Sequence, residues 1–259
     1  MLDPKTLFDG LRNSELLHGS MTQKQVDGVN GIIWAWNEGP KGMWTGPVYD
    51  ADLAYILATI WHETARQLYP IHEYGGTAYF TRMYEHRRDL GNTQPGDGAR
   101  YCGRGYVQIT GRANYHKFSQ LLKQFFPGED VDIEANPDLA LKPKLSAVIA
   151  LYGMSHGTFT GRSLSNYIHG GVCDFVGARR IINPDNNGRK IAGYANIFLP
   201  VVKAATAAYS QSQVQSAPEP KPVDDTVKPF TVHLSDEAIA KYHELSNPDA
   251  VIEKALLGN

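Results

Sequence analysis

Apolar positions recur at helical spacing along most of residues 1–209. Apolar side chains three and four positions apart share one face of a helix, so this pattern predicts amphipathic helices. The expected helices cover residues 22–37, 50–66, 112–125, 143–156, 174–183 and 190–209. Together they predict a mainly α-helical domain.

The helical pattern fails between residues 67 and 111, which are rich in glycine, arginine and aromatic residues. This composition indicates loops with a short hairpin. A loop-rich segment of this length inside a compact helical domain is usually functional. We therefore expect part of the functional site in this segment.

One stretch of this segment alternates between polar and apolar residues. Residues 103–110 read GRGYVQIT, which predicts a short strand followed by a helix that opens near Thr110 to Arg112. The expected strand places four side chains on one face: Arg104, Tyr106, Gln108 and Thr110. An ordinary buried strand with a capped helix is the alternative interpretation.

The composition changes after Tyr209. Residues 210–229 hold four prolines and no apolar periodicity, as expected for a linker. Residues 230–259 look helical, with Ser235 as a cap and a break at Asn247-Pro248. The sequence thus predicts a domain at 1–209, a linker at 210–229 and a helical extension at 230–259, whose role as a wall-binding helix, partner helix or solvated tail stays open.

Charge and hydropathy limit the possible partners. The chain has 25 Lys and Arg against 27 Asp and Glu, so nothing global attracts it to nucleic acid or to an anionic membrane. It begins with no basic region followed by an apolar one and has no run of 18 apolar residues. We expect a monomer made in a host cytoplasm without a signal peptide and without stable membrane insertion.

The cysteines and histidines do not predict a metal site. Cys102 and Cys173 lack metal or redox spacing, so two reduced, partly buried thiols are expected, with one disulfide as the alternative. The zinc motif H-E-x-x-H fails because Arg66 replaces its second histidine. His62 and His72 are expected to be packed or hydrogen-bonded.

Glu63 lies near the end of the helix expected at 50–66. It falls on the flank of the apolar stripe, near Ile56 and Ile60, and so should be half buried. The helix also presents its negative end there, and both effects favour the protonated carboxyl. A protonated carboxyl is what glycoside cleavage requires of a general acid. A surface carboxylate at a fraying helix end is the alternative.

A second carboxylate is needed for an inverting glycosidase, about 6.5 to 9.5 Å from the acid. Glu73 and Glu85 are the candidates, and sequence alone does not choose between them. Glu85 has Arg82 and Arg88 three residues away on either side, which favours a solvated ion pair. Glu73 is therefore the preferred base. Neutral amides and hydroxyls suited to sugars and to a catalytic water are supplied by Gln108, Thr110 and Asn114.

Four ordered motifs resemble those of glycoside hydrolase family 19, particularly its phage endolysin branch. They are His62-Glu63-Thr64, the segment LGNTQPGDGARY, residues 103–110 followed by Asn114-Tyr115, and the segment RRIIN at 179–183. The resemblance spans roughly residues 20–205.

The resemblance implies an α+β, mainly α-helical, lysozyme-like domain with two lobes, a central cleft and no metal or organic cofactor. It implies Glu63 as general acid and Glu73 as base, with water held near Thr110. The implied substrate-binding residues are His62, Tyr106, Gln108, Asn114 and Asn183.

The short spacing between Glu63 and Glu73 is similar to that of phage lysins and departs from plant chitinases, where a longer insert separates the two carboxylates. The expected substrate is therefore peptidoglycan, reached after the membrane is permeabilised. A chitinase of the same mechanism and a non-catalytic sugar-binding module are the alternatives.

Overall fold

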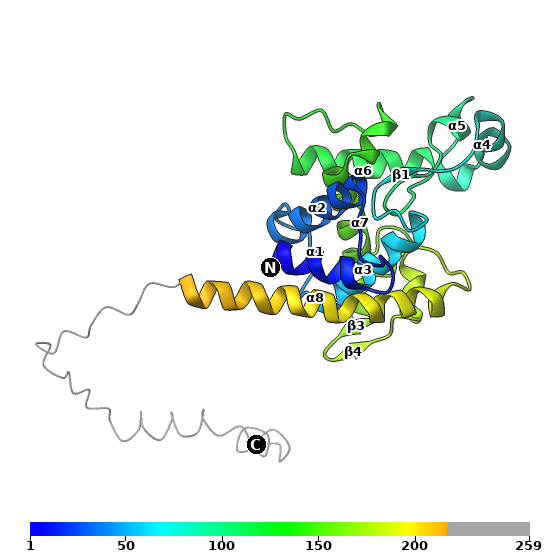
Figure 1. Cartoon of the computed structure of the whole chain (residues 1–259). Helices are drawn as coiled ribbons and strands as arrows, with labels where there is room; N and C mark the ends of the chain where they lie inside the picture. The colour runs from blue at the N-terminus through cyan, green and yellow to red at the C-terminus, as the bar shows by residue number, and fades with distance from the viewer. Residues whose placement is uncertain (217–259) are drawn as a thin grey trace, which may run out of the picture. The chain divides into compact units, whose positions relative to one another are not determined.

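The computed structural model describes residues 1–216, which form one compact unit (Figure 1). Helices dominate this unit, and its strands form two short antiparallel pairs. The α+β, mainly helical class expected from the sequence is confirmed. The helical extension expected at 230–259 lies outside the described residues.

The helices are α1 (Pro4–Asn13), α2 (Gln23–Glu38), α3 (Asp50–Glu63), α4 (Thr77–Tyr84), α5 (Asp97–Arg100), α6 (Arg112–Phe125), α7 (Pro143–Ser155) and α8 (Gly188–Ser216). Short 3₁₀ helices lie at Arg88–Leu90, Pro137–Leu141, Leu164–Asn166 and Gly177–Ile181, the last labelled η4. Strands β1 (Ile71–His72) and β2 (Arg104–Gly105) pair, as do β3 (Ile168–His169) and β4 (Val172–Cys173).

Helix α3 runs through the centre of the core and positions Glu63. It is buried from Ala51 to Trp61 and packs against α8 and α7. The helix ends at Glu63, earlier than residue 66, because Ala65 and Arg66 adopt positive φ. Burial of the whole helix therefore holds its last residue at a fixed place on the core.

Helix α8 extends further than the sequence indicates. It reaches Ser216, so residues 210–216 continue the helix and the linker expected from 210 is wrong over this stretch. Adding turns to an existing helix costs little, since nucleation is already complete, and glutamine is a good helix former. By length and composition alone α8 is also able to cross a membrane, but Ile191, Phe198 and Val202 are buried where it packs on α3 and α1.

The segment 67–111 contains helices α4 and α5 as well as loops. Its short strand pairing joins β1 to β2 across a long connection, with Ile71 opposite Gly105, in place of a local hairpin. The prediction that alternate side chains from Arg104 to Thr110 lie on one face of a strand is wrong. Gly105 and Gln108 have φ of 89° and 53°, and Arg104 bridges back to Ile109, so the chain turns within this stretch.

Two further expectations are corrected. Residues 174–183 form the short η4 in place of an α-helix: the Asp174 carboxylate accepts from the Gly177 N–H, and Pro184 disfavours helix at the residue before it. The described cysteines are unpaired, with Cys102 buried and Cys173 exposed. The disulfide alternative is therefore wrong.

Helix α1 was not expected, although its signals are present in the sequence. Asp3 accepts from the Thr6 N–H at 2.8 Å, and Pro4 opens the first turn. Leu7 and Leu11 then face the core. A capped apolar stripe of this kind identifies a helix even where it is short.

Candidate active site

Glu63 closes α3 with its side chain 18% exposed, half buried as expected from the sequence. Its Oε1 accepts an ion-paired hydrogen bond from Nη1 of Arg179, on η4. Arg179 is itself buried, and its guanidinium donates to both carboxylate oxygens of Asp185, from Nε at 2.9 Å and from Nη2 at 2.6 Å. A guanidinium held on two sides has a fixed orientation, so it points one donor at the Glu63 carboxylate.

The Arg179 contact changes the electrostatics expected for Glu63. The Arg179 guanidinium places a positive charge against the Glu63 carboxylate, beside the negative end of α3. Burial acts to lower the pKa of Arg179, but the contacts with Asp185 and Glu63 outweigh it and raise that pKa. The Arg179 hydrogen bond holds the pKa of Asp185 below its usual range. The sequence did not indicate this ion pair between Arg179 and Glu63, because the partner comes from a distant segment.

His62 lies beside Glu63 and is half buried. Burial is the main cause that lowers the pKa of His62, and the nearby Glu63 charge opposes it. The imidazole is therefore neutral near pH 7, and it can donate a hydrogen bond to a sugar hydroxyl or accept one from it.

The turn after Glu63 is strained. Ala65, Arg66 and Leu68 all have positive φ, and the buried Thr64 holds the turn by donating to Ile60 O at 2.7 Å and accepting from Leu68 N at 3.1 Å. Non-glycine residues in the left-handed region are uncommon, and such strain concentrates at functional sites. The turn leads directly into β1 and then to Glu73.

Glu73 follows β1, and both of its carboxylate oxygens have partners. Tyr84 on α4 donates its hydroxyl to Oε1 at 2.7 Å, and Gly103 donates its N–H to Oε2 at 2.9 Å. Burial first, and then the bond to Glu73, raise the pKa of Tyr84, so the phenol keeps its proton and remains a donor. Glu73 is thus fixed in orientation with lone pairs still available.

Gln108 lies beside Glu73 across the backbone of Gly103. A Cβ added to Gly103 would sit 2.9 Å from Gln108 Oε1 and 3.0 Å from Glu73 Oε2. The Gln108 amide donates to Ile71 O at 2.9 Å and to Gly105 O at 2.8 Å, which fixes its carbonyl oxygen toward Gly103. The structure therefore brings together the predicted base and one predicted sugar-binding amide.

Thr110 and Asn114 lie on the same turn into α6 and are half buried. Thr110 Oγ1 donates to Gln108 O at 3.0 Å, and Asn114 Nδ2 donates to Thr110 O at 2.9 Å. Each side chain supports the loop with one donor and keeps an acceptor oxygen available.

Tyr106 and Glu85 have different surroundings from those expected, and Asn183 lies at the surface. Tyr106 is fully buried and donates its hydroxyl to Gly28 O at 2.6 Å, so it is a core residue and its expected sugar-binding role is wrong. Glu85 accepts from the N–H groups of Gly96 and Gly98 at 2.6 and 2.7 Å, and within residues 1–216 it forms no ion pair with an arginine. Asn183 is exposed, and its N–H donates to Arg179 O at 3.1 Å.

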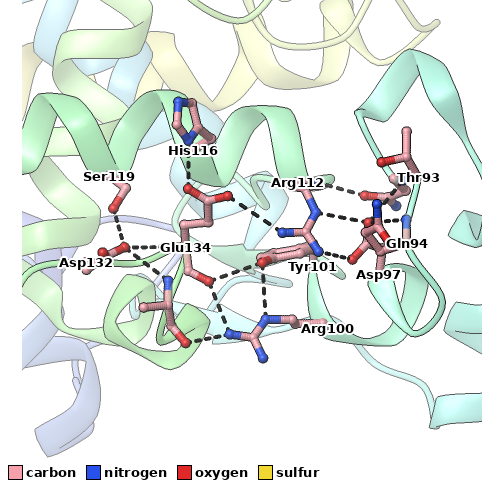
Figure 2. A network of polar contacts seen from close by, with 12 residues as sticks. Thr93, Gln94, Asp97, Arg100, Tyr101, Arg112, His116, Ser119, Asp132 and Glu134 are labelled. Atoms are coloured by element: carbon pink, nitrogen blue, oxygen red, sulfur yellow. Dashed lines mark hydrogen bonds and ion pairs between the residues drawn. The ribbon is translucent and has the colours of Figure 1, made fainter.

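Asp97 anchors a second polar cluster, which holds the start of α6 in place (Figure 2). Its carboxylate accepts from the N–H groups of Thr93 and Gln94 and pairs with Arg112, the first residue of α6. Farther along, Glu134 pairs with His116 at 2.6 Å. The cluster ties the α5 loop to the helix that carries Asn114.

Residues 1–216 contain no group of three His, Cys, Asp or Glu side chains arranged to hold a metal ion. His72, one of the histidines considered as a ligand, is instead hydrogen-bonded to the Glu73 carbonyl at 2.8 Å and packs edge-on against Phe80. The expected hydrogen-bonded role of His72 is confirmed.

Arg179 and Asp185 are the site residues that the sequence did not indicate. Arg179 was noted only as part of the RRIIN motif, and Asp185 lies just beyond it. Nothing in residue spacing links either of them to Glu63, which precedes Arg179 by 116 positions.

No protein-family model matches the chain. A segment of 61 residues is 43% identical to a glycosyl hydrolase family 19 domain-containing protein of Haemophilus influenzae, and it covers 24% of this chain and 30% of the relative. The chain therefore matches less than a third of that relative's length. This match supports the resemblance to family 19 read from the motifs.

Two solved structures are also similar to this chain. Chitinase C from Streptomyces griseus HUT6037 has a TM-score of 0.49 at 18% identity, over 79% of this chain and 94% of that one. A bacterial family 19 chitinase has a TM-score of 0.48 at 18% identity, over 78% and 94% of the two chains. These structural similarities by themselves assign no activity to this chain.

Proposed function

We propose that the chain is a glycoside hydrolase of the family 19 type that inverts the anomeric centre, with Glu63 as general acid and Glu73 as general base. The observation that carries this proposal is the pair of oriented carboxylates. Arg179 holds Glu63 at the end of a buried helix, and Tyr84 with Gly103 holds Glu73. Two carboxylates on separate supports, one on each side of a bond, are what single displacement needs.

In the proposed reaction, Glu63 donates its proton to the glycosidic oxygen as that bond breaks. Arg179, held by Asp185, then stabilises the carboxylate that remains. Glu63 must carry this proton when the substrate is bound and water is excluded from the site. Catalytic hydrogen bonds often reach their working geometry only in the substrate complex.

Glu73 accepts a proton from the attacking water in this proposal. Gln108 Oε1 and Glu73 Oε2 both lie against Gly103, and the Thr110 hydroxyl donates to Gln108 O. Gln108 and Thr110 supply acceptors that orient the water. His62, Asn114 and Asn183 bind the sugar. The proposed architecture is a lysozyme-like cleft between two lobes, with one carboxylate on each.

The proposed substrate is a β-1,4-linked chain of N-acetylated amino sugars, and specifically peptidoglycan, as for a phage endolysin. The short connection from Glu63 to Glu73 through a tight, strained turn supports this, since it lacks a long insert between the two carboxylates. A chitinase with the same residues is the second candidate.

The experiment compares two activities of the purified chain. Turbidity loss of outer-membrane-permeabilised Gram-negative cells reports peptidoglycan cleavage, and release of soluble oligomers reports chitin cleavage. Proton NMR of the first product should show the α-anomer from a β-linked substrate. A β-anomer would contradict the inverting mechanism, and no cleavage of either polymer would contradict the proposed function.

A further inference from the structure

A cavity of about 510 Å³ is bordered by the segment that carries Arg179. It is lined by η4 and by the first turn of α8, with Arg180, Asp185 and Arg189 among its walls. Arg179 also lines it while bonding to Glu63. One buried guanidinium therefore connects the cavity to the proposed acid.

The charge of this cavity is positive, although the whole chain carries a net charge of −2. Its only acidic lining residue, Asp185, is already engaged, since both of its oxygens accept from Arg179. Arg180 and Arg189 are exposed, and in the described part of the chain neither side chain forms an ion pair or a hydrogen bond. Two guanidiniums are thus available to an anionic ligand.

The cluster around Asp97 (Figure 2) makes a useful contrast, since it also borders a cavity, of about 610 Å³. There Arg112 pairs with Asp97 and Glu134, and Arg100 donates to Ala135 O at 2.6 Å. Both guanidinium groups therefore already have partners within the protein. The cavity beside Arg179 differs because its outer arginines have no such partners.

We propose that Arg180 and Arg189 bind a carboxylate of the peptide stem attached to peptidoglycan, and so select peptide-bearing strands over chitin. Chitin is an uncharged polymer, and it offers nothing for two unpaired guanidiniums to recognise. Stem peptides carry carboxylates, which guanidinium groups bind through paired, charge-assisted hydrogen bonds. This inference rests on the proposed function, because it names the substrate class of the same site.

The position of the cavity fits this role. Asn183, exposed and proposed to contact the sugar, lies in the segment between Arg180 and the cavity-lining Pro184. A glycan strand bound at Glu63 and Asn183 would therefore direct its substituents toward the two arginines. Arg180 and Arg189 are specificity-determining residues in this scheme and take no part in proton transfer.

The test uses the full chain and one soluble glycan in two forms, with native stem peptides or with their carboxylates converted to neutral amides by carbodiimide and ammonia. The wild type should cleave the native form with kcat/KM at least about tenfold above that for the amidated form, a modest value for charge-assisted hydrogen bonds. The variant R180Q/R189Q should lose this preference and keep the wild-type rate on the amidated form. Equal wild-type rates on both forms, or an unchanged preference in the variant, would overturn the proposal.

A matched control is K24Q/K41Q, which removes two positive charges at exposed positions outside the cavity lining. It should retain the wild-type preference; a loss equal to that of R180Q/R189Q would show a global charge effect and overturn the assignment. Both variants should keep the thermal midpoint of the wild type.

A binding measurement separates this proposal from the proposed function. If the wild type cleaves neither form and no chitin oligomer, the hydrolase assignment fails, while the same fluorescently labelled strands still report affinity. The native strand should then bind the wild type about tenfold more tightly than it binds R180Q/R189Q. Equal affinity would overturn the carboxylate site.

Discussion

Arg179 donates to Glu63 across 116 positions of sequence, and this ion pair joins the end of α3 to η4. The Arg179 side chain is 4% exposed, so its charge is compensated only by Glu63 and Asp185 within the described residues. The pair therefore contributes to the stability of the fold as well as to the proposed chemistry.

Replacing Arg179 with alanine should destabilise the protein, because it leaves two carboxylates without their partner. We expect a loss of about 2 kcal/mol or more, below the ~3–5 kcal/mol of fully buried pairs since both carboxylates are partly exposed. Chemical denaturation measures this loss. Arg87→Ala removes an exposed pair with Asp89 and is the control, with a much smaller expected loss of stability, because solvent screens exposed pairs. Equal losses in the two variants would contradict the structural role of Arg179.

A methyl group at Gly103 should displace the proposed base, Glu73, while leaving its carboxylate chemically unchanged. The added Cβ would lie 2.9 Å from Gln108 Oε1 and 3.0 Å from Glu73 Oε2, so the carboxylate and the amide must move apart. We expect Gly103→Ala to lower kcat by about tenfold, as small misplacements at a reacting centre do. Gly193→Ala, on α8 with open space around its Cβ, is the control and should keep full activity. Full activity of Gly103→Ala would place the catalytic water elsewhere.

Glu73 and Glu85 should respond differently to amide substitution. Glu73→Gln should lower turnover by ~10²-fold or more, the usual scale for losing a general base. Glu85→Gln should affect stability more than turnover, because an amide oxygen replaces only one of two acceptors for the N–H groups of Gly96 and Gly98. Steady-state kinetics beside thermal melting measures both. An active Glu73→Gln with an inactive Glu85→Gln would make Glu85 the base.

Asp52 should make stability fall as pH rises. Burial raises the pKa of Asp52 from 3.8 to about 6, and the hydrogen bond from Tyr49 N–H only partly offsets this. The folded state then binds more protons than the unfolded state between about pH 4 and 6. The contribution of protonated Asp52 to the free energy of unfolding is therefore fully present below about pH 4 and lost above about pH 6. The free energy of unfolding falls by about 3 kcal/mol at most over this range, because each pKa unit corresponds to ~1.4 kcal/mol.

Asp52→Asn keeps an oxygen for the Tyr49 N–H and removes the ionisation. The variant should therefore melt at a higher temperature than the wild type at pH 7.5, and the difference should vanish at pH 3.5. A constant difference between the two proteins from pH 3.5 to 7.5 would contradict a buried, ionising Asp52.

The sequence predicts the long helices well, because their apolar stripes are local signals. The helix expected at 112–125 coincides with α6, and those at 22–37 and 143–156 differ from α2 and α7 by a residue at their ends. The ends of α3 and α8 were harder to predict. Helix α3 ends where residues after Glu63 adopt positive φ, and α8 is longer than expected because extending an existing helix costs little free energy.

The site was predicted only in part, since long-range contacts decide it. The positions of Glu73, Gln108 and Thr110 on adjacent backbone follow from the pairing of β1 with β2, which no periodicity indicates. Tyr106 was assigned to the substrate face by alternation, but two positive φ angles turn it into the core. The partner of Glu63 lies on a separate segment, so the ion pair with Arg179 was not predicted.

The most direct test of the account is the activity of Glu63→Gln. The substitution keeps the shape of the side chain and its contact with Arg179 while removing the proton to be transferred. With a thermal midpoint showing that the variant is folded, kcat on soluble glycan should fall by about 10³-fold, within the range for a general acid. Activity within about tenfold of the wild type in the folded variant would contradict Glu63 as the acid.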